Sequence, residues 1–304
     1  MAYRNFEEMV QQVKAAPVMR DLAVAAAADK PVLEAAIRAL REGIANPIFV
    51  GSAEKITALL QELGEDPKQF RIQDCAEGEE GQAAVELVKD GKASLIMKGL
   101  METRQILSPV VKKENGLRTG ELMSHVVFFQ LPNYHKLLMT TDGGMVIYPS
   151  LEEKVHIVEN AVTALHAMGY ENPKLAVVAG IEKVNPKMPE TTDAAALKQM
   201  NQEGKITGCT IEGPISYDIA MDPQIAKHKG FAGGDCGDFD CLIMPNLVAG
   251  NILGKCYTVT VGAPMAGVIM GAKVPIIMTS RGSDENEKFY SIVMAARIAM
   301  GGNK

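Results

Sequence analysis

Residues 274–288 read Val-Pro-Ile-Ile-Met-Thr-Ser-Arg-Gly-Ser-Asp-Glu-Asn-Glu-Lys. The apolar run predicts a buried strand that ends at Ser280-Arg281-Gly282, and the segment after it predicts a helix from about Asp284. A hydroxyl, a guanidinium and carboxylates therefore gather where a strand ends and a helix begins. In open α/β sheets ligands bind at that edge, and a helix N-terminus favours anions. We expect this turn to hold a phosphate or a phosphorylated substrate.

The same strand-then-helix pattern recurs through the chain. Short apolar runs predict strands at residues 46–50, 70–73, 93–97, 125–131, 136–139, 174–179, 207–212 and 239–244. Helical spacing of apolar residues predicts helices at 4–44, 52–63, 79–89, 102–113, 150–168, 191–201, 246–260 and from 284 onward. Strands that alternate with helices predict a parallel sheet covered on both faces. Two strands follow each other with little helix between them at 125–139, so we expect a domain boundary near residue 140.

Composition describes an ordinary globular protein. The 304 residues are enough for two domains, and 47% of them are hydrophobic while 22% are charged. The net charge of −6 argues against a broad electrostatic grip on nucleic acid. Five cysteines form no CxxC pair, and the first residues carry no signal-peptide pattern. We therefore expect reduced cysteines and a cytoplasmic protein without membrane association.

Several polar loops follow apolar strands and are candidates for the site. Each combines glycine or proline with polar side chains, at 98–103, 183–190, 213–218, 245–251 and 280–282, and Lys255 lies one turn beyond the fourth. One such loop is ordinary turn chemistry, but five would face one edge of a doubly wound sheet. The motifs GxGxxG, GxxxxGK[ST], GxSxG and HExxH are absent, and the histidines show no ligand spacing.

A family resemblance becomes specific when these loops are taken together. KGLMET (98–103), KVNPKMPET (183–191), EGPISYDIA (212–220), DCLIMPNLVAGNILGK (240–255) and TSRGSDENE (279–287) resemble the phosphate acetyl/butyryltransferase family over nearly the whole chain. The KGLMET form and the short length favour its butyryl branch, since the acetyl branch tends to carry a small Ser-Gly there.

This resemblance implies a fold and an activity. It implies two doubly wound α/β domains of the isocitrate/isopropylmalate dehydrogenase-like type with an interdomain cleft. The C-terminal segment returns to the first domain, so residues 1–140 plus 266–304 would form one domain and 141–265 the other. The implied activity is reversible acyl transfer between acyl-CoA, above all butyryl-CoA, and inorganic phosphate. It would proceed through a ternary complex in a homo-oligomer, with CoA as a substrate and with no metal or cofactor.

The resemblance also implies roles for individual residues. Arg281 would bind the phosphate, and its planar fork suits phosphate oxygens. Ser280 would hydrogen-bond the sulfur or the acyl oxygen. The resemblance places substrate-binding groups at Lys98, Gly99, Asn185, Lys187, Pro214, Asn246, Asn251 and Lys255.

Two hypotheses are open for the role of Glu287. By resemblance it stands where the acetyl branch has an aspartate proposed to deprotonate the CoA thiol, and the chemistry needs such a base because only the thiolate attacks. Asp284 and Glu287 also have the spacing of a capping box, which would make Glu287 a structural residue of the helix. Asn246 has a similar alternative as a helix cap.

One departure from the family pattern and three alternative functions remain. Acetyltransferases carry an arginine in an Leu-Arg-Pro context where this chain has Ser108, so the contacts to the CoA phosphates are unassigned. A phosphate acetyltransferase is the nearest alternative. An NAD- and metal-dependent 2-hydroxy-acid dehydrogenase of the same fold lacks support, since no paired DxxxD motif follows a late strand. A non-catalytic CoA-binding module is the alternative from another class.

Overall fold

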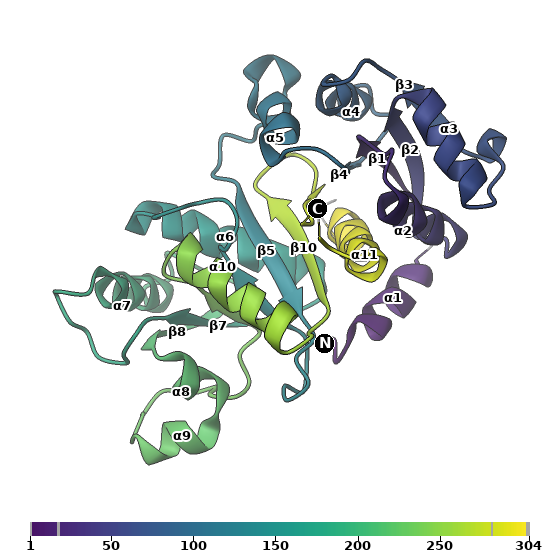
Figure 1. Cartoon of the computed structure of the whole chain (residues 1–304). Coiled ribbons are helices and arrows are strands. Elements are labelled where there is room, and N and C mark those ends of the chain that lie inside the picture. Colours follow the sequence, from purple (N-terminus) through teal and green to yellow (C-terminus); the bar gives the residue numbers. More distant parts are fainter. Residues whose placement is uncertain (1, 17–18, 281, 302–304) are drawn as a thin grey trace. The chain divides into compact units, whose positions relative to one another are not determined.

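The computed structural model describes residues 2–16, 19–280 and 282–301, and its chain divides into two compact units (Figure 1). The terminal unit comprises Phe6–Glu121 and Ala266–Lys304, and the middle unit comprises Leu122–Met265 with Met1–Asn5. In this grouping the segment from Ala266 onward falls in the same unit as Phe6–Glu121, and the first division lies at residue 121. The domain boundaries themselves stay a prediction, and each unit is described separately below.

The described residues of the terminal unit form six strands in the order β3-β2-β1-β4-β11-β10. These are β1 (Arg20–Ala25), β2 (Ala45–Gly51), β3 (Arg71–Asp74), β4 (Leu95–Lys98), β10 (Met265–Met270) and β11 (Ile276–Ile277). All neighbouring pairs are parallel except β10 and β11, which are antiparallel. The sheet is therefore mixed, although four of these five neighbouring pairs are parallel, as the alternation of strands and helices predicts.

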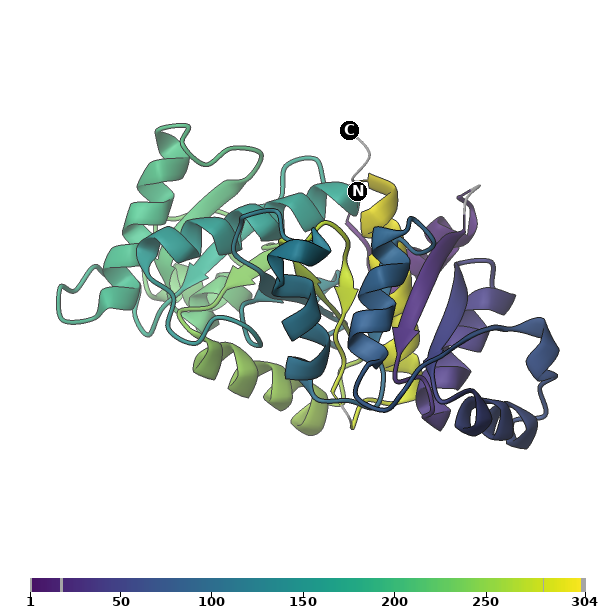
Figure 2. The same cartoon turned by 90° about the horizontal axis from the view of Figure 1, so that it is seen from above.

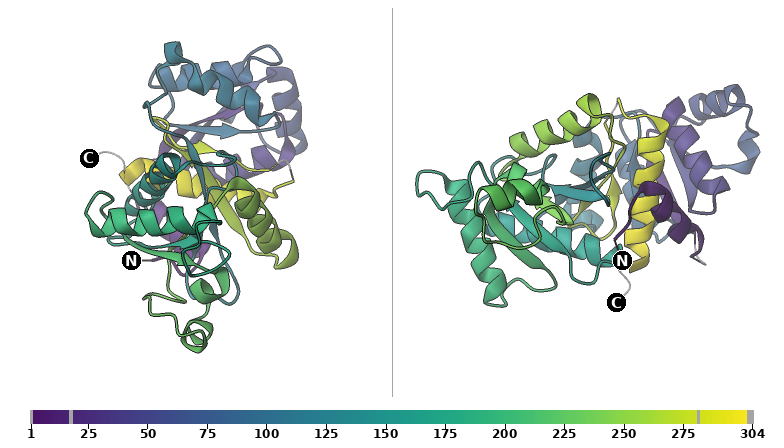
Figure 3. Two further views of the ribbon diagram at one scale, coloured as in Figure 1. Left: turned by 90° about the vertical axis from the view of Figure 1, so that its left-hand side faces the viewer. Right: turned by 90° about the horizontal axis from the view of Figure 1, so that it is seen from below.

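Helices cover both faces of this unit's strands. They are α1 (Phe6–Lys14), α2 (Lys30–Arg41), α3 (Ala53–Glu62), α4 (Glu80–Lys89), α5 (Thr103–Val111) and α11 (Glu285–Gly301), with short 3-10 turns at Pro67–Gln69 and Lys113–Asn115. Helix α11 packs on α1 and α2, as Figure 2 and the right-hand view of Figure 3 show, while α4 packs on β1 and α5. The Phe6 and Tyr290 rings stack at 4.6 Å, and the Arg38 guanidinium lies 3.7 Å above the Phe289 ring. The two ends of the chain thus share one apolar core.

The interpretation of residues 4–44 as wholly helical was wrong. Its middle part, Arg20–Ala25, is strand β1, which lies between β2 and β4. The run of alanines around this strand has high intrinsic helix propensity, which led to the prediction of a helix. Small side chains also fit a strand that is buried on both faces, and here tertiary pairing overrides propensity.

The middle unit contains five strands in the order β5-β6-β9-β7-β8. These are β5 (Ser124–Phe129), β6 (Leu138–Thr141), β7 (Lys174–Val178), β8 (Thr210–Ile215) and β9 (Cys241–Ile243). Only β5 and β6 are antiparallel. Its helices are α6 (Leu151–Ala167), α7 (Pro189–Gln202), α8 (Tyr217–Met221), α9 (Pro223–His228) and α10 (Leu247–Lys255), which continues as a π-helix over Cys256–Thr260.

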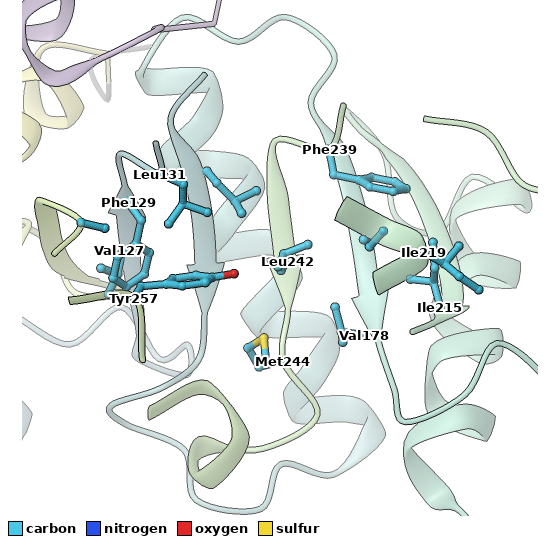
Figure 4. Close-up of a cluster of buried hydrophobic side chains, with 14 of the residues drawn as sticks. Val127, Phe129, Leu131, Val178, Ile215, Ile219, Phe239, Leu242, Met244 and Tyr257 are labelled. Carbon is cyan, nitrogen blue, oxygen red and sulfur yellow. The ribbon is translucent and has the colours of Figure 1, made fainter. Parts of the chain in front are cut away.

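A buried apolar cluster fills one side of the middle unit (Figure 4). Phe129, Leu242 and Val178 come from strands β5, β9 and β7, while Ile219 comes from α8 and Tyr257 from the π-helix. On the other side α6 begins at Ser150, whose hydroxyl accepts from the Glu153 N–H at 3.2 Å in the expected capping box. Among the described residues, no helix is both long enough and apolar enough to cross a membrane.

Candidate active site

Three strand ends of the terminal unit bring candidate residues to one edge. Strands β1, β4 and β11 are parallel neighbours, so their carboxyl ends meet there. Lys98 and Gly99 follow β4, and Ser280 follows β11. The Gly99 N–H donates to the Ala25 carbonyl at 2.8 Å, and the Thr103 hydroxyl lies 3.8 Å from the Met278 sulfur. The structure therefore places the Lys98–Thr103 loop beside the segment that leads to Ser280.

Lys98 and Gly99 shape the loop after β4. Lys98 is only 4% exposed, and its Nζ donates to the carbonyl oxygens of Gly99 at 3.4 Å and Met101 at 3.2 Å. A Cβ on Gly99 would lie 2.3 Å from the Ala26 carbonyl oxygen, closer than any side chain tolerates. Glycine is thus required because the backbones of two strand ends approach each other here.

The turn before α11 is held by backbone and hydroxyl contacts. The Ser280 hydroxyl, which is exposed, accepts from the Gly282 N–H at 3.3 Å, and the Ser280 carbonyl accepts from the Ser283 N–H at 3.1 Å. The Asp284 carboxylate accepts from the Glu287 N–H at 2.8 Å, so Asp284 caps the helix. Arg281 lies outside the described residues, and its expected phosphate contact stays a prediction.

Glu287 lies half-buried in the first turn of α11. Burial raises the pKa of its carboxyl group, the Ser283 hydroxyl opposes this rise, and the nearby Asp284 carboxylate adds to it, so that the pKa stays above its usual value. Among the described residues, no hydrogen bond joins the Glu287 carboxylate to the Asp284 N–H, so only half of the capping box forms. A carboxylate with a raised pKa is better matched to proton transfer near neutral pH than an ordinary one.

A second set of candidates lies on the middle unit. Strands β6, β9, β7 and β8 are parallel, and the polar loops follow their carboxyl ends. The side-chain oxygen Oδ1 of Asn246 accepts a hydrogen bond from the Ala249 N–H at 3.0 Å, so Asn246 caps α10. The Asn251 amide donates to the Gly143 carbonyl at 3.1 Å, and Lys255 is exposed at the end of the same helix.

The remaining candidates of the middle unit are Asn185, Lys187 and Pro214. Asn185 stabilises its own loop, since its side chain accepts from the Lys187 N–H at 3.0 Å while the Lys187 side chain is exposed. Pro214 is buried within β8. The expected roles of these three residues in substrate binding stay predictions.

Asp142 is a residue that the sequence analysis missed. It follows β6, is 2% exposed, and accepts from three backbone N–H groups, those of Gly144 at 2.7 Å, Met145 at 2.9 Å and Val146 at 3.1 Å. Its carboxylate therefore fixes the loop that contacts α10. The Asp-Gly-Gly sequence directly after an apolar strand was the available signal, because aspartate organises turns through its own following backbone.

Helix α10 approaches this loop so closely that residue 250 has no room for a side chain. A Cβ on Gly250 would lie 2.5 Å from the Asp142 carbonyl oxygen and 2.9 Å from the Gly143 Cα. We expect Gly250→Ala to lower the free energy of unfolding by about 1–3 kcal/mol, because backbone atoms must move apart. Gly254→Ala in the same helix is the control, since its Cβ would meet only a ring carbon of Phe129 at 3.3 Å. Chemical denaturation measures both, and equal stability of the two variants would contradict the close approach.

Metal ligation finds no support among residues 2–16, 19–280 and 282–301. No three histidine, cysteine, aspartate or glutamate side chains are grouped there so that they could hold an ion. Among the polar groups described above, the cationic and hydroxyl side chains suit a phosphorylated or anionic ligand.

Sequence comparison assigns the chain to a family. The pattern of the phosphate acetyl/butaryl transferase family matches residues 78–296, so the chain belongs to this family. Phosphate butyryltransferase of Clostridium acetobutylicum is 42% identical over 302 residues, covering 99% of this chain and 99% of that protein. Phosphate acetyltransferase of Thermotoga maritima is 42% identical over 280 residues, covering 92% and 95%.

A solved structure supports the same assignment. The branched-chain phosphotransacylase from Enterococcus faecalis V583 matches with a TM-score of 0.83 at 30% sequence identity, covering 92% of this chain and 99% of that one. The α/β fold with a mixed sheet is thus similar to that of a phosphotransacylase. The family resemblance inferred from the five loops is confirmed.

Proposed function

We propose that this protein transfers an acyl group reversibly between acyl-CoA and inorganic phosphate, with butyryl-CoA as the preferred thioester. The observation that carries the proposal is the similarity to phosphate butyryltransferase over 99% of both chains. The turn before α11 adds a chemical reason, because it carries the exposed Ser280 hydroxyl and leads directly into the first turn of α11, where the Glu287 carboxyl group has a raised pKa.

Each residue of this turn has a proposed role in the reaction. Glu287 takes the proton of the CoA thiol, and the thiolate then attacks the carbonyl carbon of the acyl phosphate. The new C–S bond forms as the C–O bond to phosphate breaks, and the proton ends on the released phosphate. Ser280 donates to the acyl oxygen or the sulfur, while Arg281 binds the phosphate. Positioning and charge stabilisation supply the catalysis, without a metal or a further cofactor.

Direct transfer in a ternary complex is proposed on the resemblance, and four of the five cysteines are consistent with it, whereas Cys256 is exposed. Burial raises the pKa of the Cys75 and Cys209 thiols to about 11, and it raises the pKa of Cys236 and Cys241 as well. Only a thiolate is an effective nucleophile, so these four residues are poor acceptors of an acyl group. A mechanism without an acyl-enzyme intermediate fits this distribution.

The finer architecture is proposed on the resemblance. It comprises domains at 1–140 plus 266–304 and at 141–265, and a dehydrogenase-like cleft that would bring Lys98, Gly99 and Ser280 together with Asn185, Lys187, Pro214, Asn246, Asn251 and Lys255. Support comes from candidate residues at the carboxyl ends of parallel strands in both units. A cytoplasmic location and a homo-oligomeric state are proposed on the resemblance alone.

Acetyl transfer is the second candidate, because the acetyltransferase of Thermotoga maritima is as identical to this chain as the butyryltransferase is. One experiment tests both. Thiol release is followed with purified protein, phosphate and a series of C2 to C6 acyl-CoA substrates, and we expect the highest kcat/KM with butyryl-CoA. Because one methylene in a pocket changes the transition-state free energy by about 1–3 kcal/mol, neighbouring substrates should differ about 5- to 150-fold. Absence of thiol release with every member of the series would reject the proposed function.

Arg281→Ala should lower activity mainly by weakening the binding of phosphate. Loss of charge-assisted hydrogen bonds is expected to cost about 1.5–3 kcal/mol, which raises the KM for phosphate about 10- to 150-fold. The KM for acyl-CoA should change little. Arg41→Ala is the control, because Arg41 is an exposed arginine of the same unit that pairs with Glu65. Initial rates over both substrates decide, and an unchanged phosphate KM in Arg281→Ala would contradict the assignment.

A further inference from the structure

Lys288 is a buried cation beneath the turn that precedes α11. It is the fourth residue of the helix and is only 3% exposed. Its Nζ donates a short hydrogen bond to the Ser283 carbonyl oxygen. Among the residues that the structure describes, no carboxylate lies close enough to form an ion pair with it. The proposed mechanism does not use this ammonium group.

A lysine in this position is costly. Burial lowers the pKa of the Lys288 ammonium, which the carboxylates of Asp29, Glu287 and Asp284 only partly oppose. The adjacent helix residues Phe289 and Ile292 are fully buried in the apolar core. A leucine or methionine would fill such a site without the cost of desolvating a charge. The ammonium therefore has a use that packing alone does not supply.

That use is visible in the turn itself. Ser283 belongs to the turn in which the Ser280 hydroxyl and carbonyl accept from Gly282 and Ser283. Lys288 holds the far side of this turn through the Ser283 carbonyl. The Ser283 side chain is itself buried, and its hydroxyl lowers the pKa of the Glu287 carboxyl group, so Lys288 and Glu287 both act on the same residue of the turn. Side chains on a helix lean toward its N-terminus, which brings the charge of Lys288 under the first turn.

We propose that Lys288 is a positioning residue of the phosphate subsite. Its ammonium holds Ser283 in place through the Ser283 carbonyl oxygen, and its charge adds to the positive end of α11 in favouring an anion. This inference rests on the proposed function, in which the same turn binds inorganic phosphate. It assigns no contact between Lys288 and the substrate.

The test compares Lys288→Met, which keeps the length of the stem but removes the charge and the donors, with Lys288→Arg, which keeps both. Kinetics with butyryl-CoA and phosphate should show the KM for phosphate raised about 10- to 100-fold in Lys288→Met, as for loss of a charged hydrogen bond. The KM for butyryl-CoA should stay near the wild-type value, and Lys288→Arg should restore most of the phosphate KM. Lys92→Met, at an exposed lysine of the same unit that pairs with Asp90, is the control.

A binding measurement separates this inference from the proposed function. Inorganic phosphate should raise the Tm of the wild-type protein and of Lys92→Met, and it should not raise that of Lys288→Met, whereas CoA should stabilise all three. If the wild type releases no thiol, the proposed function fails. The phosphate-dependent Tm shift alone then tests whether Lys288 supports phosphate binding. An unchanged phosphate response in Lys288→Met, or an equal loss for phosphate and CoA, overturns the inference. If Lys288→Met does not fold, Lys288→Gln is measured in its place, and failure of both to fold assigns Lys288 to stability and also overturns it.

Discussion

Glu287→Gln is expected to lower kcat about 10²- to 10⁴-fold, the range that general base catalysis contributes. Glutamine keeps the size of the side chain and cannot accept the thiol proton. The pH profile should change with it. Since burial first and Asp284 next raise the pKa of Glu287, the wild-type rate should fall as the pH drops through a value above that of an ordinary glutamate. This acidic limb should be absent from Glu287→Gln. Rates across the pH range with saturating substrates measure both effects.

The role of Glu287 in the helix can be separated from this one. Asp284 is the residue whose carboxylate caps α11, so Asp284→Ala should lower the free energy of unfolding by about 0.5–2 kcal/mol. Glu287→Gln should not, because the raised pKa means that folding disfavours the ionised carboxylate. A variant Glu287→Gln that keeps the full rate, or that loses stability as Asp284→Ala does, would return Glu287 to a structural role.

Lys136→Met is expected to lower the free energy of unfolding by about 3–5 kcal/mol. Lys136 and Asp240 are both buried, and Nζ lies 2.6 Å from the Asp240 carboxylate. Lys136 also reaches Asp238 at 2.9 Å, which in turn binds Lys174 at 2.7 Å. Removal of the lysine leaves the Asp240 carboxylate buried without its cation. Denaturation in urea at neutral pH measures the loss.

Two controls show whether burial causes this effect. Lys205→Met removes an exposed lysine that pairs with Glu203, and we expect a change of about 0–1 kcal/mol. The double variant Lys136→Met with Asp240→Leu should recover much of the loss, because no unpaired charge remains inside. A loss below about 1 kcal/mol for Lys136→Met alone would show that the pair is not desolvated as its burial indicates.

Acid should weaken the same network. Burial alone would raise the pKa of Asp238, yet the hydrogen bonds from Lys174 and Lys136 hold that pKa well below its usual range. A carboxyl group with a lowered folded-state pKa contributes stability above its unfolded-state pKa, and the contribution is lost as the pH falls toward the folded-state value. The stability of the middle unit should therefore decline in acid.

Most elements follow from local patterns in the sequence. Ser52 caps α3 and Ser150 opens α6 because each hydroxyl can satisfy helix N–H groups within three residues. Strand β1 was missed because pairing with β2 and β4 decides its state, and no local pattern contains that information. Strand β10 was missed as well, and β11 pairs over only Ile276–Ile277 although a longer run around it is apolar.

The candidate site was predictable where a strand end determines it. Lys98, Gly99 and Ser280 could be expected at one edge because parallel strands end together. Asp142 was missed, since its three N–H partners become apparent only when the loop is folded. Lys288 was missed because a lysine in a helix is ordinarily exposed, and its burial depends on how α11 packs. The sequence spacing of Asp284 and Glu287 fits both a single cap and a full capping box, and only the folded turn shows that Asp284 caps the helix by itself.

The order of segments in the terminal unit has a consequence for synthesis of the chain. Strand β4 pairs with β1 on one side and with β11 on the other, and β11 is synthesised only after the whole middle unit. Until then one edge of β4 and the apolar surface that α11 covers are open to wrong partners, which favours aggregation. Ser280 and Glu287 arrive with the same segment. A ribosome that stops early would thus release a chain that lacks both the closing strand and the proposed catalytic groups, so a partly made protein could not act on its substrates.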